Sequence, residues 1–276
     1  MHTYGIEIEC QHRRNSNPTR VAQELNERFR ASTDPLISQF SVGNHRQANR
    51  SRTEFALDHE GNGLECRSPA LTVEQWPVIK FVTQNLRELG CWASRQDGTH
   101  MHFGWQDLPT TLKPRAVSAW TAFWAVYRPV MQRLVPDTRR RNYNCLQSRQ
   151  LGTHYTWEDL TRPFIAASNA QWRMTDFVYT MVNPNTEHNT TEVRLHHGTL
   201  NATRMRGWML LMQGILGYTD ALATAGSLED LEQTYRSNHP IDAMHQIMLD
   251  KARPFLTQRQ FRQMSTQINS RVESYR

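Results

Sequence analysis

Two glutamates near the start of the chain have the spacing of a metal-binding pair. Glu7 and Glu9 alternate with apolar Tyr4, Ile6 and Ile8. In a β-strand, side chains two residues apart project from one face, so the two carboxylates would lie close together. Hard cations such as Mg²⁺ or Mn²⁺ choose oxygen ligands and would relieve the repulsion between these charges. The alternative, which is commoner for an isolated pair of this kind, is a strand face exposed to solvent.

Glu65 is a third acid in an alternating segment. Leu64 and Cys66 alternate there with Glu65 and Arg67, so the acid and the arginine would share one face. This spacing is typical of a surface ion pair. It equally allows Glu65 to serve as one more carboxylate beside a cation.

Two histidines, His100 and His102, also share a strand face. They follow a turn at Asp97-Gly98, and Met101 and Phe103 would point to the core from the other face. Paired imidazoles at this spacing can bind a metal ion or contact phosphate. Buried histidines that only hydrogen-bond to the backbone are an equally weighted alternative.

Glu192 and Arg194 form a fourth motif on one strand face, opposite Val193 and Leu195. Glu192 could hold a cation while Arg194 offers its planar guanidinium to a phosphate or carboxylate. The alternative is an ion pair between the two side chains. A turn at Gly198-Thr199 would then open a helix, whose N-terminus favours anions.

The four motifs support one another when they are taken together. Each would place an acid, or a histidine pair, on one face of a strand. If these faces meet on one sheet, the crowded charges repel one another unless cations neutralise them. A phosphate site with two or more divalent cations is the simplest explanation of the set, which comprises Glu7, Glu9, Glu65, His100, His102, Glu192 and Arg194.

The elements that would carry these residues are short strands and helices. Strands are predicted over residues 4–9, 36–42, 53–57, 64–67, 92–94, 99–105, 172–182 and 190–196, with a break between the last two at Asn183-Pro184-Asn185. Helices are predicted from Pro18 through Phe29, from Thr72 to Gly90, briefly from Thr156, and over residues 114–134, 201–225, 228–237, 240–252 and 254–274. Thr72 with Gln75 forms a capping box, and Gly90 is a typical glycine after a helix end. Because the strands occur in hairpin-like clusters between helices, we predict an α+β fold with an antiparallel sheet and flanking helices.

Composition limits the class of protein. The 276 residues are 38% hydrophobic and 21% charged, which is typical of a globular chain and argues against disorder. The 32 basic and 26 acidic residues give a net charge of +6, spread along the chain apart from Arg133 and Arg139–Arg141. Such a surplus suits nucleotides or other anionic ligands but is too diffuse to predict a nucleic-acid binder.

The sequence also argues against a membrane or secreted protein. No apolar run approaches the about 20 residues of a membrane span. Glutamates stand where a signal peptide needs its apolar segment, so we expect a cytoplasmic protein. Its cysteines, Cys10, Cys66, Cys91 and Cys145, are far apart and are expected to be reduced thiols.

The order of the motifs resembles the amidoligase family of the carboxylate–amine ligase superfamily, which includes glutamine synthetase and glutamate–cysteine ligase. The resemblance runs from the first strand to about residue 215. It rests on Tyr4-Gly5-Ile6-Glu7-Ile8-Glu9, on Glu65 with Ser68-Pro69, on Thr99-His100-Met101-His102-Phe103-Gly104, and on Thr191-Glu192-Val193-Arg194 with Gly198-Thr199-Leu200. Less strict family elements are Arg139–Cys145 and Tyr179 with Asn183.

The resemblance implies a glutamine-synthetase-like catalytic fold, in which the concave face of a curved antiparallel sheet holds ATP and two or three Mg²⁺ or Mn²⁺ ions. In such ligases ATP phosphorylates a substrate carboxylate, and an amine then displaces phosphate from the acyl phosphate to form an amide or isopeptide bond. We therefore expect one ligase-like domain over residues 1–276, with a catalytic core at 1–225 and a helical C-terminal extension at 226–276. The carboxylate substrate would be glutamate, a peptide or a protein side chain, and the oligomeric state is left open.

The resemblance also implies a role for each matched residue. The metal ligands would be Glu7, Glu9, Glu65, His100 and Glu192, with Glu7 also close to the nucleotide. His102 would face nucleotide or substrate, and Arg194 would meet the transferred phosphate. A substrate carboxylate would be held by Arg139, Arg141 and Tyr143, with weaker matches at Arg173 and Asn183.

Three other functions are compatible with parts of the sequence. A nucleotide-binding or assembly protein of the same fold could lack turnover, although the complete set of acids speaks against a degenerate site. A metal-dependent phosphohydrolase would release phosphate with no amine present. A nucleic-acid binder would rest on Arg133 and Arg139–Arg141, and its affinity would fall steeply with salt.

Overall fold

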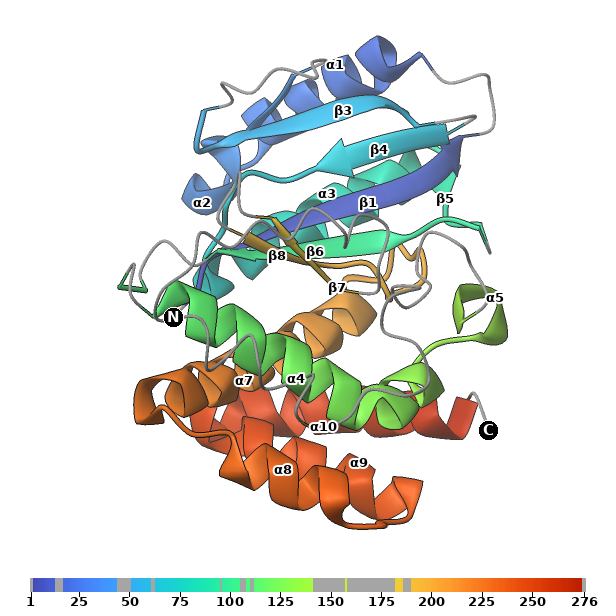
Figure 1. The fold of residues 1–276 in the computed structure, drawn as a ribbon. Helices are drawn as coiled ribbons and strands as arrows, with labels where there is room; N and C mark the ends of the chain where they lie inside the picture. The colour runs from blue at the N-terminus through green and yellow to red at the C-terminus, as the bar shows by residue number, and fades with distance from the viewer. Residues whose placement is uncertain are drawn as a thin grey trace. The chain divides into compact units, whose positions relative to one another are not determined.

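A computed structural model describes residues 2–12, 17–43, 51–60, 63–94, 96–104, 108–109, 112–140, 157, 182–185 and 190–274 (Figure 1). The chain divides into two compact units. The first comprises Met1–Phe103 and Val193–Arg206, and the second comprises Gly104–Glu192 and Gly207–Arg276. The predicted boundary between a catalytic core and a C-terminal extension stays a prediction.

The first unit is built on a sheet with flanking helices, which confirms the predicted α+β class. Its strands lie in the order β2 (Ser41–Gly43), β3 (Glu54–Glu60), β4 (Gly63–Arg67), β1 (Tyr4–His12) and β6 (Thr99–Gly104), and β5 (Cys91–Trp92) pairs with β1 (Figure 1). The pairs β3–β4, β4–β1, β1–β6 and β1–β5 are antiparallel, as predicted. The pair β2–β3 is parallel, which differs from the predicted all-antiparallel sheet. A parallel pair cannot be joined by a two-residue hairpin turn.

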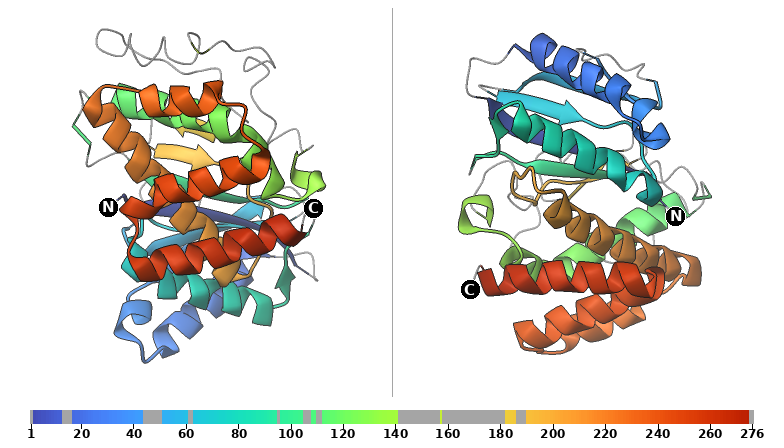
Figure 2. Two further views of the ribbon diagram at one scale, coloured as in Figure 1. Left: turned by 90° about the horizontal axis from the view of Figure 1, so that it is seen from below. Right: turned by 180° about the vertical axis from the view of Figure 1, so that it is seen from behind.

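One face of this sheet is apolar and forms the core of the first unit. Ile6, Leu57, Leu64 and Met101 are at most 1% exposed. The helices α1 (Pro18–Ala31) and α3 (Trp76–Glu88) lie across this face (Figure 2, right). Because side chains alternate along a strand, the polar residues between these apolar ones lie on the opposite face.

Both helices begin with the signals that the sequence carries. The side chain of Asn17 accepts a hydrogen bond from the backbone N–H of Thr19 at 3.0 Å, and Pro18 takes the first helical position. The predicted capping box of Thr72 and Gln75 is present at the short 3-10 helix η1 (Val73–Gln75), which leads into α3. Gly90 ends that helix with a φ of 86°, a conformation that favours glycine.

The strand predicted over residues 36–42 is only partly correct. Pro35–Ser38 form the short helix α2, and β2 begins at Ser41. The side chain of Asp34 caps this helix by accepting a hydrogen bond from the N–H of Leu36 at 2.9 Å, and Pro35 has the φ that a first helical turn requires. The cap and the proline therefore outweigh the apolar character of Leu36 and Ile37.

The second unit is mainly helical. Its elements are α4 (Lys113–Arg133), α5 (Asp137–Arg140), β7 (Val182–Asn185), β8 (Thr190–Val193), α7 (Ala202–Ala225, which starts in the first unit), α8 (Glu229–Arg236), α9 (Ile241–Ala252), η4 (Arg253–Phe255) and α10 (Gln258–Ser274). The helices predicted over 114–134, 201–225, 228–237 and 240–252 are confirmed. The last predicted helix begins later, at Gln258, and the break predicted at residues 183–185 lies within β7. Most of the strand predicted at 172–182 and the helical turn predicted from Thr156 lie outside the described residues.

Close packing and one polar network hold the helices of this unit together. A Cβ added to Gly214 of α7 would lie 2.7 Å from the Cβ of Ala252 on α9, so the two backbones approach closely. The phenol of Tyr218 donates a hydrogen bond of 2.5 Å to Asp230 on α8, and the ammonium of Lys251 on α9 lies 2.5 Å from the same carboxylate. α9 thus packs closely against α7, α8 is joined to α7 by a hydrogen bond, and an ion pair joins α8 to α9.

The described cysteines and helices bear on two further predictions from the sequence. Cys10, Cys66 and Cys91 are buried and form no disulfide within the described residues, and Cys145 lies outside those residues. In the part of the chain that the structure describes, none of the helices has both the length and the apolar character that crossing a membrane takes.

Candidate functional site

The polar face of the first unit's sheet carries a row of acids. Glu9 on β1 is directly opposite Glu65 on β4, and Glu65 is directly opposite Asp58 on β3. Like charges in directly opposed positions destabilise a sheet. Three carboxylates in one row therefore call for positive charge close by.

A second row beside it supplies part of that charge. Glu7 on β1 is opposite Arg67 on one side and His100 of β6 on the other. Arg67 forms an ion pair with Asp58, and its Nε lies 3.3 Å from Oε2 of Glu65. The predicted ion pair between Glu65 and Arg67 is thus present, and it belongs to a larger cluster.

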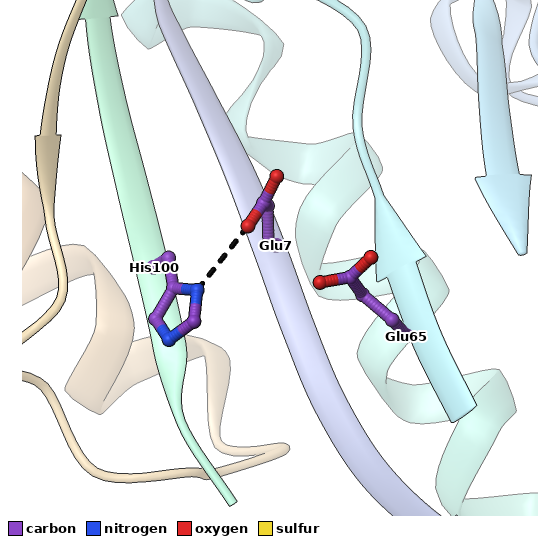
Figure 3. Close-up of side chains that lie close together, drawn as sticks. All are labelled: Glu7, Glu65 and His100. Carbon is purple, nitrogen blue, oxygen red and sulfur yellow. Dashed lines mark hydrogen bonds and ion pairs between the residues drawn. The ribbon is translucent and has the colours of Figure 1, made fainter. Parts of the chain in front are cut away.

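His100 bridges the two glutamates of the first strand. Its Nδ1 lies 3.2 Å from Oε2 of Glu7, and its Nε2 lies 3.3 Å from Oε1 of Glu9 (Figure 3 shows the first of these contacts). The side chain is only 3% exposed, so these carboxylates face the imidazole in a largely dry environment. His100 therefore contacts acids on the polar face, and its partners are not limited to the backbone.

His102 lies two residues beyond His100 on the same face of β6 and contacts the other carboxylate oxygen of Glu7. Its Nε2 is 3.3 Å from Oε1 of Glu7. Burial alone would raise the pKa of Glu7, but the hydrogen bond with His100 and the nearby imidazole of His102 hold that pKa well below its usual range. Glu7 is thus a carboxylate kept in its charged form between two imidazoles.

Three of the predicted ligands could hold one metal ion. Ligand atoms of Glu7, Glu65 and His100 lie within 4.8 Å of one another, from three neighbouring strands (Figure 3). Two carboxylates and an imidazole suit Mn²⁺, Mg²⁺ or another divalent cation. The donor set therefore fits the metal that the sequence predicts.

Glu9 is oriented by the turn before β6. The backbone N–H of Gly98 donates to Oε2 of Glu9 at 2.5 Å, and the N–H of Glu9 donates to the carbonyl of Gly98 at 3.1 Å. The other carboxylate oxygen faces His100. The turn therefore fixes the carboxylate of Glu9 with one oxygen toward Gly98 and the other toward His100.

Asp97 holds the turn before β6 in place. Its carboxylate accepts hydrogen bonds from the side chain of Gln11 at 2.8 Å and from the N–H of Ser94 at 2.5 Å. Its carbonyl accepts from the N–H of Gly198 at 2.8 Å. A Cβ at Gly198 would lie only 2.7 Å from the Cβ of Asp97, so glycine is required there by close approach.

The Glu192–Arg194 motif is divided between the two units. Arg194 is half-buried in the first unit, in a segment tied to β6 where the N–H of Thr99 donates to the carbonyl of His196 at 3.1 Å. Glu192 is buried on β8 in the second unit. Its role as a metal ligand stays a prediction, and the strand ends at Val193, before Arg194.

The residues predicted to hold a substrate carboxylate are mostly not described. Arg139 is buried on α5 in the second unit. Arg141, Tyr143 and Arg173 lie outside the described residues, and Asn183 is described only as part of the backbone of β7. Their substrate contacts stay predictions.

Asp58 belongs to the row of acids but was not among the predicted site residues. The period-two signal was present, since Phe55 and Leu57 are buried core residues and Asp58 follows them on the opposite face. The predicted strand stopped at residue 57, whereas β3 continues to Glu60. A longer strand prediction would have placed Asp58 on the same face as the other acids.

Comparison with known proteins identifies the family. Residues 1–216 match a family model described as "Putative amidoligase enzyme". A sequence comparison with curated proteins gives no match. The structure resembles a chain in the crystal structure of the complex between the prokaryotic ubiquitin-like protein Pup and its ligase PafA, with a TM-score of 0.42 and 11% identity, over 99% of this chain and 64% of that chain. This chain thus spans less than two thirds of that chain's length. Because the family model covers well over half of the sequence, the chain belongs to the amidoligase family.

Proposed function

We propose that the protein is an ATP- and Mg²⁺-dependent carboxylate–amine ligase, which forms an amide or isopeptide bond through an acyl phosphate. The observation that carries this proposal is the convergence of Glu7, Glu65 and His100 on one side of the sheet in an amidoligase chain. The carboxylate donor in this proposal is glutamate, a peptide or a protein side chain.

The proposed reaction needs charge placed with care and little covalent chemistry from the protein. A carboxylate oxygen of the substrate attacks the γ-phosphorus of ATP, and the bond to the β-phosphate breaks to release ADP. The amine then attacks the acyl carbon, phosphate leaves, and the amine nitrogen loses its proton. Bound Mg²⁺ or Mn²⁺ would neutralise the phosphate oxygens.

The residues of the sheet would hold and orient the reactants. Glu7, Glu9, Glu65 and His100 would be the ligands of divalent cations, and the resemblance adds Glu192 to this set. His102, which contacts Glu7, would orient nucleotide or substrate. Arg194 would offer two parallel N–H donors to the transferred phosphoryl group.

The direct test is ADP release from purified protein with ATP, Mg²⁺ and a panel of carboxylates and amines. We expect ADP release that requires both a carboxylate and an amine, together with a new amide detected by mass spectrometry. Glu9→Gln should remove this activity, whereas Glu27→Gln, an exposed position on α1, should retain it.

Two outcomes would contradict the proposal. Release of phosphate from ATP with no amine present would favour a phosphohydrolase. Failure to bind ATP with Mg²⁺ at millimolar concentration would favour a binding or assembly protein without turnover.

A further inference from the structure

The row formed by Asp58, Glu65 and Glu9 is costly without a cation. Opposed side chains on an antiparallel pair have Cβ atoms about 5 Å apart, so each carboxylate feels its neighbour directly. These side chains are also shielded from water, since Asp58 is 11% and Glu65 is 13% exposed. Burial weakens the screening that would make such repulsion small at a surface.

Arg67 is placed to neutralise one end of this row. It stands beside the row on β4, opposite the small side chain of Ala56 on β3. Its guanidinium pairs with Asp58 through Nη2, and its Nε lies 3.3 Å from Glu65. Two nitrogens of one planar group therefore contact carboxylates on two different strands.

We propose that Arg67 is a positioning residue that occupies a cation position of the acid row. Its guanidinium holds Asp58 and Glu65 together in the protein without metal and directs Glu65 toward Glu7 and His100. This inference rests on the proposed metal site. It adds that the guanidinium of Arg67 fills one of the cation positions in the acid row. Divalent cations are thereby confined to the end of the cluster that contains Glu7 and His100.

Removal of the Arg67 guanidinium should destabilise the acid row. Without its charge, the opposed carboxylates of Asp58 and Glu65 repel each other in a mostly buried place with no guanidinium between them, which destabilises the metal-free protein. A divalent cation can then take the vacated position, because carboxylate oxygens from opposed strands are suitable ligands. The loss should therefore be reversed by metal.

The experiment compares Arg67→Met, Arg67→Lys and the double variant Arg67→Met/Asp58→Asn with the natural chain. Arg67→Met keeps an unbranched apolar stem and removes the charge. Melting temperatures are measured in EDTA and in saturating Mn²⁺, and bound Mn²⁺ is counted after equilibrium dialysis. Arg20→Met is the control, since Arg20 forms an exposed ion pair with Glu24 within α1.

We expect Arg67→Met to melt lower by about 5 °C or more in EDTA, and Mn²⁺ to close most of that gap. It should bind about one more Mn²⁺ per chain than the natural protein does. The melting temperature of Arg67→Lys in EDTA should lie between those of Arg67→Met and the natural chain, because one ammonium does not span both carboxylates. The double variant should melt near the natural chain in EDTA, since the unpaired Asp58 charge is gone, and should bind no extra ion.

Two results would overturn the proposal. One is an Arg67→Met protein that melts as the natural chain does in EDTA and binds the same number of Mn²⁺ ions. The other is a low melting temperature that neither Mn²⁺ nor Asp58→Asn corrects, which would assign Arg67 a packing role. Neither readout uses ATP or bond formation, so failure of the ligase proposal would leave this test intact.

Discussion

Glu9 and Gly98 are joined by two hydrogen bonds, one to the backbone and one to the side chain of the acid. The Gly98 N–H donates to Oε2 of Glu9 at 2.5 Å, and the Glu9 N–H donates to the Gly98 carbonyl at 3.1 Å. The carboxylate is therefore fixed by the strand pairing itself. The direction of the Glu9 carboxylate is thus set by the turn that contains Gly98.

Replacing Glu9 separates catalysis from folding. In Glu9→Gln the amide oxygen can still accept from Gly98, and the repulsion with Glu65 across β1–β4 is removed. We expect ADP release to fall about 100-fold or more, because a charged ligand is lost, while the melting temperature in EDTA is unchanged or higher. Turnover assays and thermal melts on one preparation test both halves.

A contrary result would be informative for Glu9. Normal turnover would remove this acid from the metal site, and a large fall in the melting temperature would show that its charge serves the fold. Glu27→Gln, at an exposed position on α1, should change neither quantity.

Arg194→Lys tests whether a guanidinium is needed for the transferred phosphate. Lysine keeps the charge but offers no planar pair of donors. We expect turnover to fall by about 100-fold or more with little change in the melting temperature. Near-normal turnover in steady-state assays would mean that Arg194 does not grip the phosphate.

Much of the polar cluster could be predicted because the strands are strongly alternating. Ile6 and Ile8, Leu64 and Cys66, and Met101 and Phe103 are all nearly fully buried, so their polar neighbours must share the opposite face. That reasoning needs no knowledge of which strands are adjacent. It is why Glu7, Glu65 and His100 were predicted together.

The register of the strands could not be predicted in the same way. Whether Glu9 faces Glu65 or another residue depends on pairing between segments far apart in the sequence, and a shift of one residue would move every side chain to the other face. The contact of Arg67 with Asp58 has the same origin, since local spacing indicates only its neighbour Glu65. The short helix α2 was missed because a cap and a proline outweighed two apolar residues.

Gly198→Ala tests the turn at Asp97 and Gly98, which holds the carboxylate of Glu9. A new Cβ would lie 2.7 Å from the Cβ and 2.9 Å from the carbonyl oxygen of Asp97, so the backbone must shift. We expect a loss of about 1–3 kcal/mol in the free energy of unfolding. Mn²⁺ binding should also weaken, because a shift of Asp97 moves the next residue, Gly98, which holds the carboxylate of Glu9. Urea unfolding and Mn²⁺ dialysis measure the two effects.

Gly5→Ala is the matched control for that substitution. Its new Cβ would meet the Cβ of His102 at 3.7 Å and the hydroxyl of Ser68 at 3.9 Å, which are ordinary contacts. It should therefore unfold like the natural chain. Equal destabilisation at both glycines would show that the approach of Gly198 to Asp97 has no special cost.

The helical unit provides a test that does not involve the proposed site. Asp230 is partly buried, which alone would raise its pKa, but Lys251 and Tyr218 hold that pKa below its usual value. A carboxyl group whose pKa is lower in the folded state stabilises the fold above its unfolded pKa of about 3.9. That stabilisation is lost as the pH falls through the lower, folded pKa.

Asp230→Asn should therefore have an effect that depends on pH. At pH 7 we expect it to lower the free energy of unfolding by about 1 kcal/mol, a modest value because the carboxylate is 40% exposed and solvent screens the ion pair. The difference from the natural chain should shrink as the pH falls below about 4, where the natural Asp230 also loses its charge. Urea unfolding at a series of pH values measures this, with Asp250→Asn, at an exposed position on α9, as the control. A difference that stays constant down to the lowest pH would show that Asp230 acts through packing or neutral hydrogen bonds, because only a contribution from its charge disappears on protonation.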